Sequence, residues 1–215
     1  MSTFSEPQGE DRVEEKKGNG TGGLSRRSFL QGVGLAAGAV AVPLNLRAAP
    51  DAEKAGLGPG PVKYKLKVNG KAVSIEAEPR LTLAQVLRDK LDMTGTKVVC
   101  DRGACGGCTV MIDGQSVNSC MLLALDARDR EIMTIEGLAK ADGRLDPVQE
   151  GFIEHDAQQC GFCTPGLVMR SRAFLNENPH PTLDEIKKGL AGNICRCGTY
   201  THVFAAVLAA SKKGA

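Results

Sequence analysis

Eight cysteines in two groups of four constrain this chain of 215 residues more than any other feature of its sequence. The first group follows the spacing C-x4-C-x2-C-x11-C and consists of Cys100, Cys105, Cys108 and Cys120. The second group has a C-x2-C pair and a C-x-C pair with 31 residues between them, and consists of Cys160, Cys163, Cys195 and Cys197. Cysteines this dense indicate metal ligands or disulfides, and their spacing helps to distinguish the two.

The first group has the spacing of a [2Fe–2S] centre. In plant-type ferredoxins, a C-x4-C-x2-C run and a more distant fourth cysteine hold such a cluster. Three glycines lie among the ligands here, Gly103, Gly106 and Gly107. We expect them to adopt positive φ angles, which a residue without Cβ tolerates, and to aim backbone N–H groups at the sulfur atoms. Such groups tune the reduction potential of a cluster.

Zinc and disulfides are the alternatives for these cysteines. Structural zinc sites favour two C-x2-4-C pairs with a short spacer, and neither group has that symmetry. An even number of cysteines in an exported protein favours disulfides. However, cysteines packed this tightly among glycines rarely reach the separation that a disulfide needs. We therefore predict iron–sulfur ligation.

The second group stands in the segments QCGFCTPG (159–166) and GNICRCGTY (192–200), which do not follow a ferredoxin pattern. Together with GTKVVCDRGACGGCTV (95–110) and DPVQEGFIEHDAQQCGFCTPG (146–166), they resemble the small iron–sulfur subunit of the molybdenum hydroxylases, the xanthine oxidase and aldehyde oxidase family. The resemblance covers about residues 62–211. Gly107 stands where alanine is common and Asp146 where histidine is common, and neither departure removes a ligand.

The resemblance implies two [2Fe–2S] clusters, one for each group of cysteines, so that all eight are metal ligands. It implies a heterotrimer with a large molybdenum-cofactor subunit and an FAD subunit. Electrons would pass from molybdenum through the C-terminal cluster, then through the N-terminal cluster, to FAD. Gln159 and Cys197 would contact the pterin of the molybdenum cofactor. A glutamine at a helix end can instead cap backbone groups, and this reading of Gln159 stays open.

We interpret the chain as the electron-transfer subunit of a molybdenum-containing aldehyde oxidoreductase, with no catalytic centre of its own. One alternative is the iron–sulfur subunit of an N-heterocycle dehydrogenase or hydroxylase with a cytochrome partner. Another is a free-standing ferredoxin-like carrier, which the second cluster disfavours because a soluble carrier needs only one. The isolated His155, His180 and His202 do not support a Rieske centre. Arg196 either offsets cluster charge or is simply solvated.

The N-terminal segment predicts export. Ser25-Arg26-Arg27-Ser28-Phe29-Leu30 is a twin-arginine pattern. The apolar stretch 29–42 is too short for stable membrane insertion, which takes about 20 residues, and Ala48 and Ala49 offer a cleavage site. A translocase that carries folded proteins allows a cluster built in the reducing cytoplasm to reach the periplasm. The nearly balanced charge of +2 suggests no nucleic-acid partner.

The predicted fold class is α+β, in three segments: a signal peptide and linker (1–60), a β-grasp [2Fe–2S] ferredoxin domain (61–138) and an all-α four-helix cluster-binding domain (139–215). Alternating apolar residues predict strands at 62–68 and 72–77, joined at Asn69-Gly70. The segments from Thr82 to Gln85 and from Thr182 to Glu185 are capping boxes. The first opens a helix with an apolar stripe of Leu83, Val86, Leu87 and Leu91. Further strands are expected at 109–112, 116–118 and 131–135, and helices at 147–157, 165–176, after Thr182 and at 200–212.

Overall fold

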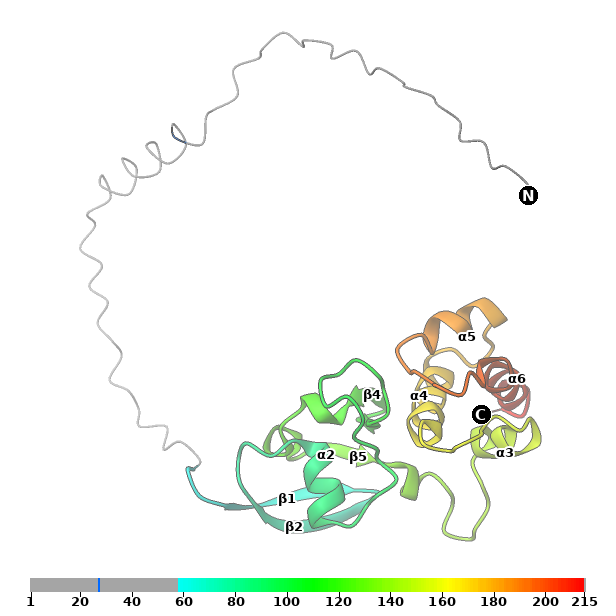
Figure 1. Ribbon diagram of the computed structural model, residues 1–215. Helices are drawn as coiled ribbons and strands as arrows, with labels where there is room; N and C mark the ends of the chain where they lie inside the picture. Colours follow the sequence, from blue (N-terminus) through cyan, green and yellow to red (C-terminus); the bar gives the residue numbers. More distant parts are fainter. Residues whose placement is uncertain (1–26, 28–57, 215) are drawn as a thin grey trace, which may run out of the picture. The chain divides into compact units, whose positions relative to one another are not determined.

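The computed structural model describes Arg27 and residues 58–214 (Figure 1). Apart from Arg27, which is exposed, the predicted export signal and its cleavage site lie outside the described residues. Residues 58–214 belong to one compact unit. Among the helices of the described part, none combines the length and apolar character needed to cross a membrane.

The N-terminal half of this unit is a mixed five-stranded sheet with the order β2-β1-β5-β3-β4. Its strands are β1 (Val62–Val68), β2 (Lys71–Ala77), β3 (Thr109–Ile112), β4 (Gln115–Asn118) and β5 (Glu131–Met133). Strands β1 and β5 run parallel, and the other neighbours run antiparallel. With the helices described below, the sheet confirms the α+β class. Strand β5 is shorter than expected because a 3-10 turn, Ile135–Gly137, follows it directly.

The hairpin of β1 and β2 shows how the sequence sets the sheet. In β1, Tyr64, Leu66 and Val68 are buried while the lysines between them are exposed. Side chains alternate between the two faces of a strand, so this pattern turns one face to the core. Asn69 and Gly70 both have positive φ, 52° and 75°, as a two-residue hairpin turn requires.

The helix after the hairpin differs from the expectation in one respect. The capping box at Thr82 is present, but only Leu83–Gln85 (α2) is α-helical, and the chain continues as a π-helix over Val86–Lys90. The N–H of Leu91 donates to the carbonyl of Val86, five residues back, at 3.2 Å. Together, α2 and the π-helix still bury the predicted apolar residues Leu83, Val86 and Leu87, while Leu91 is only half-buried.

Four helices form the C-terminal half: α3 (Pro147–Glu154), α4 (Thr164–Glu177), α5 (Leu183–Gly189) and α6 (Tyr200–Lys212). They enclose a second apolar core that includes Leu167, Leu175, Ile186, Val203 and Val207. Helix α3 ends three residues earlier than predicted because Asp156 adopts a positive φ of 49°, which a right-handed helix cannot continue through.

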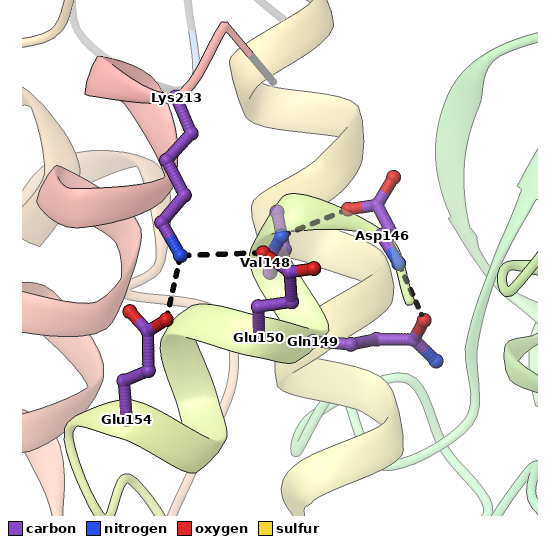
Figure 2. Close-up of polar contacts among 6 residues, drawn as sticks. All are labelled: Asp146, Val148, Gln149, Glu150, Glu154 and Lys213. Carbon is purple, nitrogen blue, oxygen red and sulfur yellow. Dashed lines mark hydrogen bonds and ion pairs between the residues drawn. The ribbon is translucent and has the colours of Figure 1, made fainter. Parts of the chain in front are cut away.

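Two sets of polar contacts hold α3 in place (Figure 2). At its start, Asp146 accepts a hydrogen bond from the N–H of Val148 at 2.9 Å, and its own N–H donates to Gln149 at 3.0 Å. Asp146 therefore serves as the N-cap of this helix. On the exposed side, Lys213 after α6 pairs with Glu150 at 3.2 Å and with Glu154 at 2.7 Å. These ion pairs fasten the C-terminal helix to α3.

The sheet and the helices share an interface centred on α4. Met169 and Ala173 of this helix are buried against Met111 of β3. Arg170 donates through Nε to the carbonyl of Gly189 at 2.8 Å and through Nη1 to the hydroxyl of Ser116 in β4. The two halves thus pack as one body, which determines how the two cysteine loops meet.

The close approach of α4 to the first cysteine loop gives a testable prediction. A Cβ added at Gly166 would lie 2.3 Å from the carbonyl oxygen of Gly106. In an open helix Gly→Ala stabilises by about 1 kcal/mol, but here we expect Gly166→Ala to destabilise by about 1–3 kcal/mol through overpacking. The measurement is the urea unfolding midpoint. Gly192→Ala is the control, because a Cβ there meets nothing within 4 Å; equal effects of the two substitutions would contradict the close contact.

Candidate metal centres

The first group of cysteines lies on the loop before β3 and on the short 3-10 turn Ser119–Met121 after β4. The thiol of Cys100 contacts that of Cys105, and the thiol of Cys108 contacts that of Cys120. The N–H of Gly103 donates to the sulfur of Cys120 at 3.3 Å. The sequence therefore brings these four sulfurs together in two pairs on a loop that offers backbone donors.

The glycines of this loop act in two ways. Gly103 and Gly106 have positive φ, 71° and 69°, as predicted. The prediction was wrong for Gly107, which has no positive φ. A Cβ at Gly107 would lie 3.0 Å from Cγ2 of Val99, so this position is tight for a side chain. The N–H of Gly107 donates to the sulfur of Cys105 at 3.5 Å, which is the role expected of a loop glycine.

The second group comes from two helix starts. Cys163 is the N-cap residue of α4, and Cys160 lies on the loop before it. Cys195 and Cys197 lie on the loop between α5 and α6. The sulfur of Cys197 lies 3.5 Å from that of Cys160, and the thiol of Cys163 contacts that of Cys195. Here too the sulfurs meet in two pairs.

This pairing fits a binuclear cluster. Each iron of a [2Fe–2S] cluster takes two of the four protein ligands, so a site for it presents its thiols as two pairs rather than four at one point. Within residues 58–214, no three His, Cys, Asp or Glu side chains gather as a single metal ion would require. The eight cysteines are also free of disulfides. Such a cluster supplies one-electron redox chemistry where these cysteines hold it.

The thiols differ in their readiness to ionise. The backbone N–H of Arg102 lowers the pKa of Cys100 to about 7. Burial raises the pKa of Cys108 to about 11 and that of Cys163 to about 12. Because only thiolates bind iron, these buried thiols must lose their protons as the metal binds. In the first group Cys108 and Cys120 are both buried, and in the second group Cys195 is buried while Cys163 is half-buried.

Sequence reasoning missed the polar groups around Cys195. Burial acts to raise the pKa of the Cys195 thiol. Hydrogen bonds from the hydroxyl and the N–H of Thr199 outweigh this effect and lower the pKa to about 7. The Thr199 hydroxyl lies 3.2 Å from the Cys195 sulfur, and the N–H of Cys195 donates to the hydroxyl of Tyr200 at 2.7 Å. A threonine directly before a predicted helix was the only signal in the sequence, and it indicates a cap rather than a cluster contact.

The two groups of cysteines lie side by side. The N–H of Ile194 donates to the carbonyl of Cys105 at 2.9 Å. The buried amide of Asn193 donates to the carbonyl of Gly106 at 2.9 Å and to the hydroxyl of Thr109 at 3.2 Å. A cavity of about 160 Å³ is lined by cysteines of both groups, Cys105, Cys160 and Cys163, together with Val99, Gly107, Phe162, Ile194 and Arg196. Backbone and a single hydrogen bond connect Cys105 to Cys195.

The remaining predicted residues lie at the surface. Gln159 and Cys160 are exposed and Cys197 is half-exposed, so this edge of the second group is accessible to a partner. The pterin contact of Gln159 and Cys197 stays a prediction. Arg196 is exposed as well. His202 makes a hydrogen bond to the carbonyl of His155 at 2.9 Å, which ties α6 to the end of α3.

The fold and the two sulfur sites define an electron-transfer protein with two iron–sulfur centres. The model of the 2Fe-2S iron-sulfur cluster binding domain matches residues 66–138, and that of a second [2Fe-2S] binding domain matches residues 134–208. The chain belongs to the family of iron–sulfur subunits of the molybdenum hydroxylases, in which it is the electron-transfer subunit.

Two relatives and one solved structure illustrate the match. The aldehyde oxidoreductase iron-sulfur-binding subunit PaoA of Escherichia coli O157:H7 is 41% identical over 202 residues, which cover 86% of this chain and 86% of that protein. The nicotine 6-hydroxylase small subunit of Paenarthrobacter nicotinovorans is 44% identical over 147 residues, which cover 68% of this chain and 88% of that protein. In the crystal structure of quinoline 2-oxidoreductase from Pseudomonas putida 86, one chain is 39% identical and matches with a TM-score of 0.69. The match covers 72% of this chain and 96% of that chain.

The contact between the loops gives a second prediction. Asn193→Ala removes one donor from the buried carbonyl of Gly106, which keeps the N–H and the hydroxyl of Thr109 as donors, so the cost should be about 0.5–1.5 kcal/mol. It should also weaken the magnetic interaction between the two reduced centres in electron paramagnetic resonance (EPR) spectra. Asn118→Ala is the matched control. The amide of Asn118 also donates to a loop carbonyl, that of Gly103 at 3.0 Å, but both residues belong to the sheet half. An unchanged interaction in Asn193→Ala would show that Asn193 does not hold the loops together.

Proposed function

We propose that this chain relays electrons in an exported molybdenum-containing aldehyde oxidoreductase, as one subunit of a heterotrimer with a molybdenum-cofactor subunit and an FAD subunit. The match to the aldehyde oxidoreductase subunit carries this proposal. It covers 86% of this chain, more than residues 55–215 supply, so it reaches into the predicted signal peptide and linker (1–60). By comparison, the match to the nicotine 6-hydroxylase small subunit covers 68% of this chain.

The surface of the second centre supports the proposed direction of electron flow. Cys160 and Gln159 are exposed there, so a pterin of the molybdenum subunit has access to this centre and to Cys197. From Cys195, the connection runs through Ile194 and one hydrogen bond to Cys105 of the first centre. We propose that electrons enter at the C-terminal centre, cross this contact and leave from the N-terminal centre to FAD.

An N-heterocycle dehydrogenase is the second candidate. Relatives of that kind match the two cluster domains with similar identity, 44% for the nicotine 6-hydroxylase subunit and 39% for quinoline 2-oxidoreductase. Identity within the cluster domains therefore does not separate the two substrate classes. This follows from the role of the chain, since the proposed relay contacts cofactors of its partners and no substrate.

Purification of the native complex tests the proposed function. We expect three kinds of subunit, molybdenum, FAD, about four irons for each copy of this chain, and oxidation of aldehydes to carboxylic acids. A cytochrome partner and turnover of N-heterocycles would favour the second candidate. Recovery of this chain alone, in active form, would make it a free-standing carrier. Zinc in place of iron would show that the iron–sulfur interpretation is wrong.

Export gives a separate prediction. Changing Arg26 and Arg27 to lysine keeps both charges but removes the guanidinium groups. If the twin-arginine pattern directs export to the periplasm, this chain and its partners should accumulate in the cytoplasm, and periplasmic aldehyde oxidation should be lost. Cell fractionation with activity measurements detects this, and Lys16 and Lys17 changed to arginine serve as the control. Normal periplasmic activity of the first variant would contradict the export assignment.

A further inference from the structure

Thr199 occupies the N-cap position of α6 without acting as a cap. A threonine at this position usually accepts a hydrogen bond from a backbone N–H of the first helical turn. Thr82 and Thr182 both do so, accepting from Gln85 and Glu185 at 3.3 Å. The side chain of Thr199 makes no such bond to the first turn of α6.

The backbone explains the difference. Thr82 and Thr182 are extended, with ψ of 157° and 161°, which turns the side chain back over the first turn of the helix. Thr199 has a ψ of 15° and follows Gly198, which has a φ of 77°. This tight loop directs the Thr199 hydroxyl away from the helix and towards Cys195.

The hydroxyl of Thr199 lies 3.2 Å from the sulfur of Cys195, within the reach of a hydrogen bond to sulfur. Both residues are buried, with 3% and 6% of their surface exposed. A thiolate that binds iron carries no proton, so the hydroxyl must be the donor. The bond therefore places a proton donor on a ligand sulfur where little water competes for it.

We propose that Thr199 is a positioning residue for electron transfer, which acts through Cys195 to raise the reduction potential of the C-terminal iron–sulfur centre. Reduction adds negative charge to the cluster and its sulfurs, and a donated hydrogen bond stabilises that added charge. The proposal rests on the proposed function, because it requires a cluster at Cys195. The Thr199 hydroxyl thereby influences how readily the C-terminal centre accepts an electron.

The α6 loop keeps this donor in place. The N–H of Cys195 donates to the hydroxyl of Tyr200 at 2.7 Å, while the carbonyl of Thr199 accepts the N–H of Val203 at 3.0 Å. The start of α6 is thus tied to Cys195 through Tyr200, independently of the Thr199 hydroxyl. Loss of the Thr199 hydroxyl alone should therefore leave the loop and the cluster in place.

The test is a redox titration of the native complex followed by EPR, with two Thr199 variants, one control variant and one variant that assigns the signals. Thr199→Val keeps the shape of the side chain but removes the hydroxyl, and should shift the midpoint of the C-terminal centre to lower potential while the other centre stays unchanged. Thr199→Ser keeps the donor and should keep the wild-type midpoint. Thr182→Val removes a true helix cap and should lower the urea unfolding midpoint without moving either potential. The signal of the C-terminal centre is the one lost in Cys197→Ser.

The outcomes separate this proposal from the proposed function. Two [2Fe–2S] signals with an unchanged midpoint in Thr199→Val would overturn the role of Thr199 alone. A wild-type complex without two such signals would overturn the iron–sulfur assignment on which it rests. If Thr199→Val does not load its cluster, electron–nuclear double resonance of the wild type in heavy water decides. An exchangeable proton that is coupled to the C-terminal centre in the wild type and is absent in Thr199→Ala supports the proposal. A wild-type protein without such a proton refutes the proposal.

Discussion

The hydrogen bonds between the two cysteine loops are the constraint on which the rest of the molecule depends. A carbonyl of one loop, that of Cys105, accepts the N–H of Ile194 from the other. The amide of Asn193 reaches Gly106 across 87 positions of sequence. Helix α4 packs closely on the same loop, since Gly166 lies against the backbone of Gly106. A relay protein needs its two centres close together, and this interface provides that closeness.

The two centres have different polar surroundings, and these follow from the elements that carry them. The first lies on a loop whose donors are backbone N–H groups of Gly103 and Gly107. Substitution of a side chain cannot remove such donors, although it can displace them. The second lies where α4 and α6 begin, and helix N-termini favour negative charge. There a side-chain hydroxyl, that of Thr199, contacts a ligand sulfur. A single side-chain change can therefore remove a donor to a ligand sulfur at the second centre.

Much of the fold follows from local signals. The alternation of β1, the Asn69-Gly70 turn and the capping boxes at Thr82 and Thr182 all appear where the sequence predicts them. The π-helix at Val86–Lys90 was not predicted, since apolar residues at helical spacing suit either kind of turn. The early end of α3 was missed for a related reason: a positive φ at Asp156 is a property of the loop that follows.

The sequence by itself determined the class of protein, the two cluster domains and the predicted ligands, because these depend on the spacing of cysteines along a short stretch of chain. It did not determine which sulfurs pair, since Cys160 meets Cys197 and Cys163 meets Cys195 only after four helices have packed. It also did not show that Asn193 joins the loops or that the hydroxyl of Thr199 faces a sulfur. Those features depend on backbone angles and on contacts between residues far apart in sequence, and only the tertiary structure decides them.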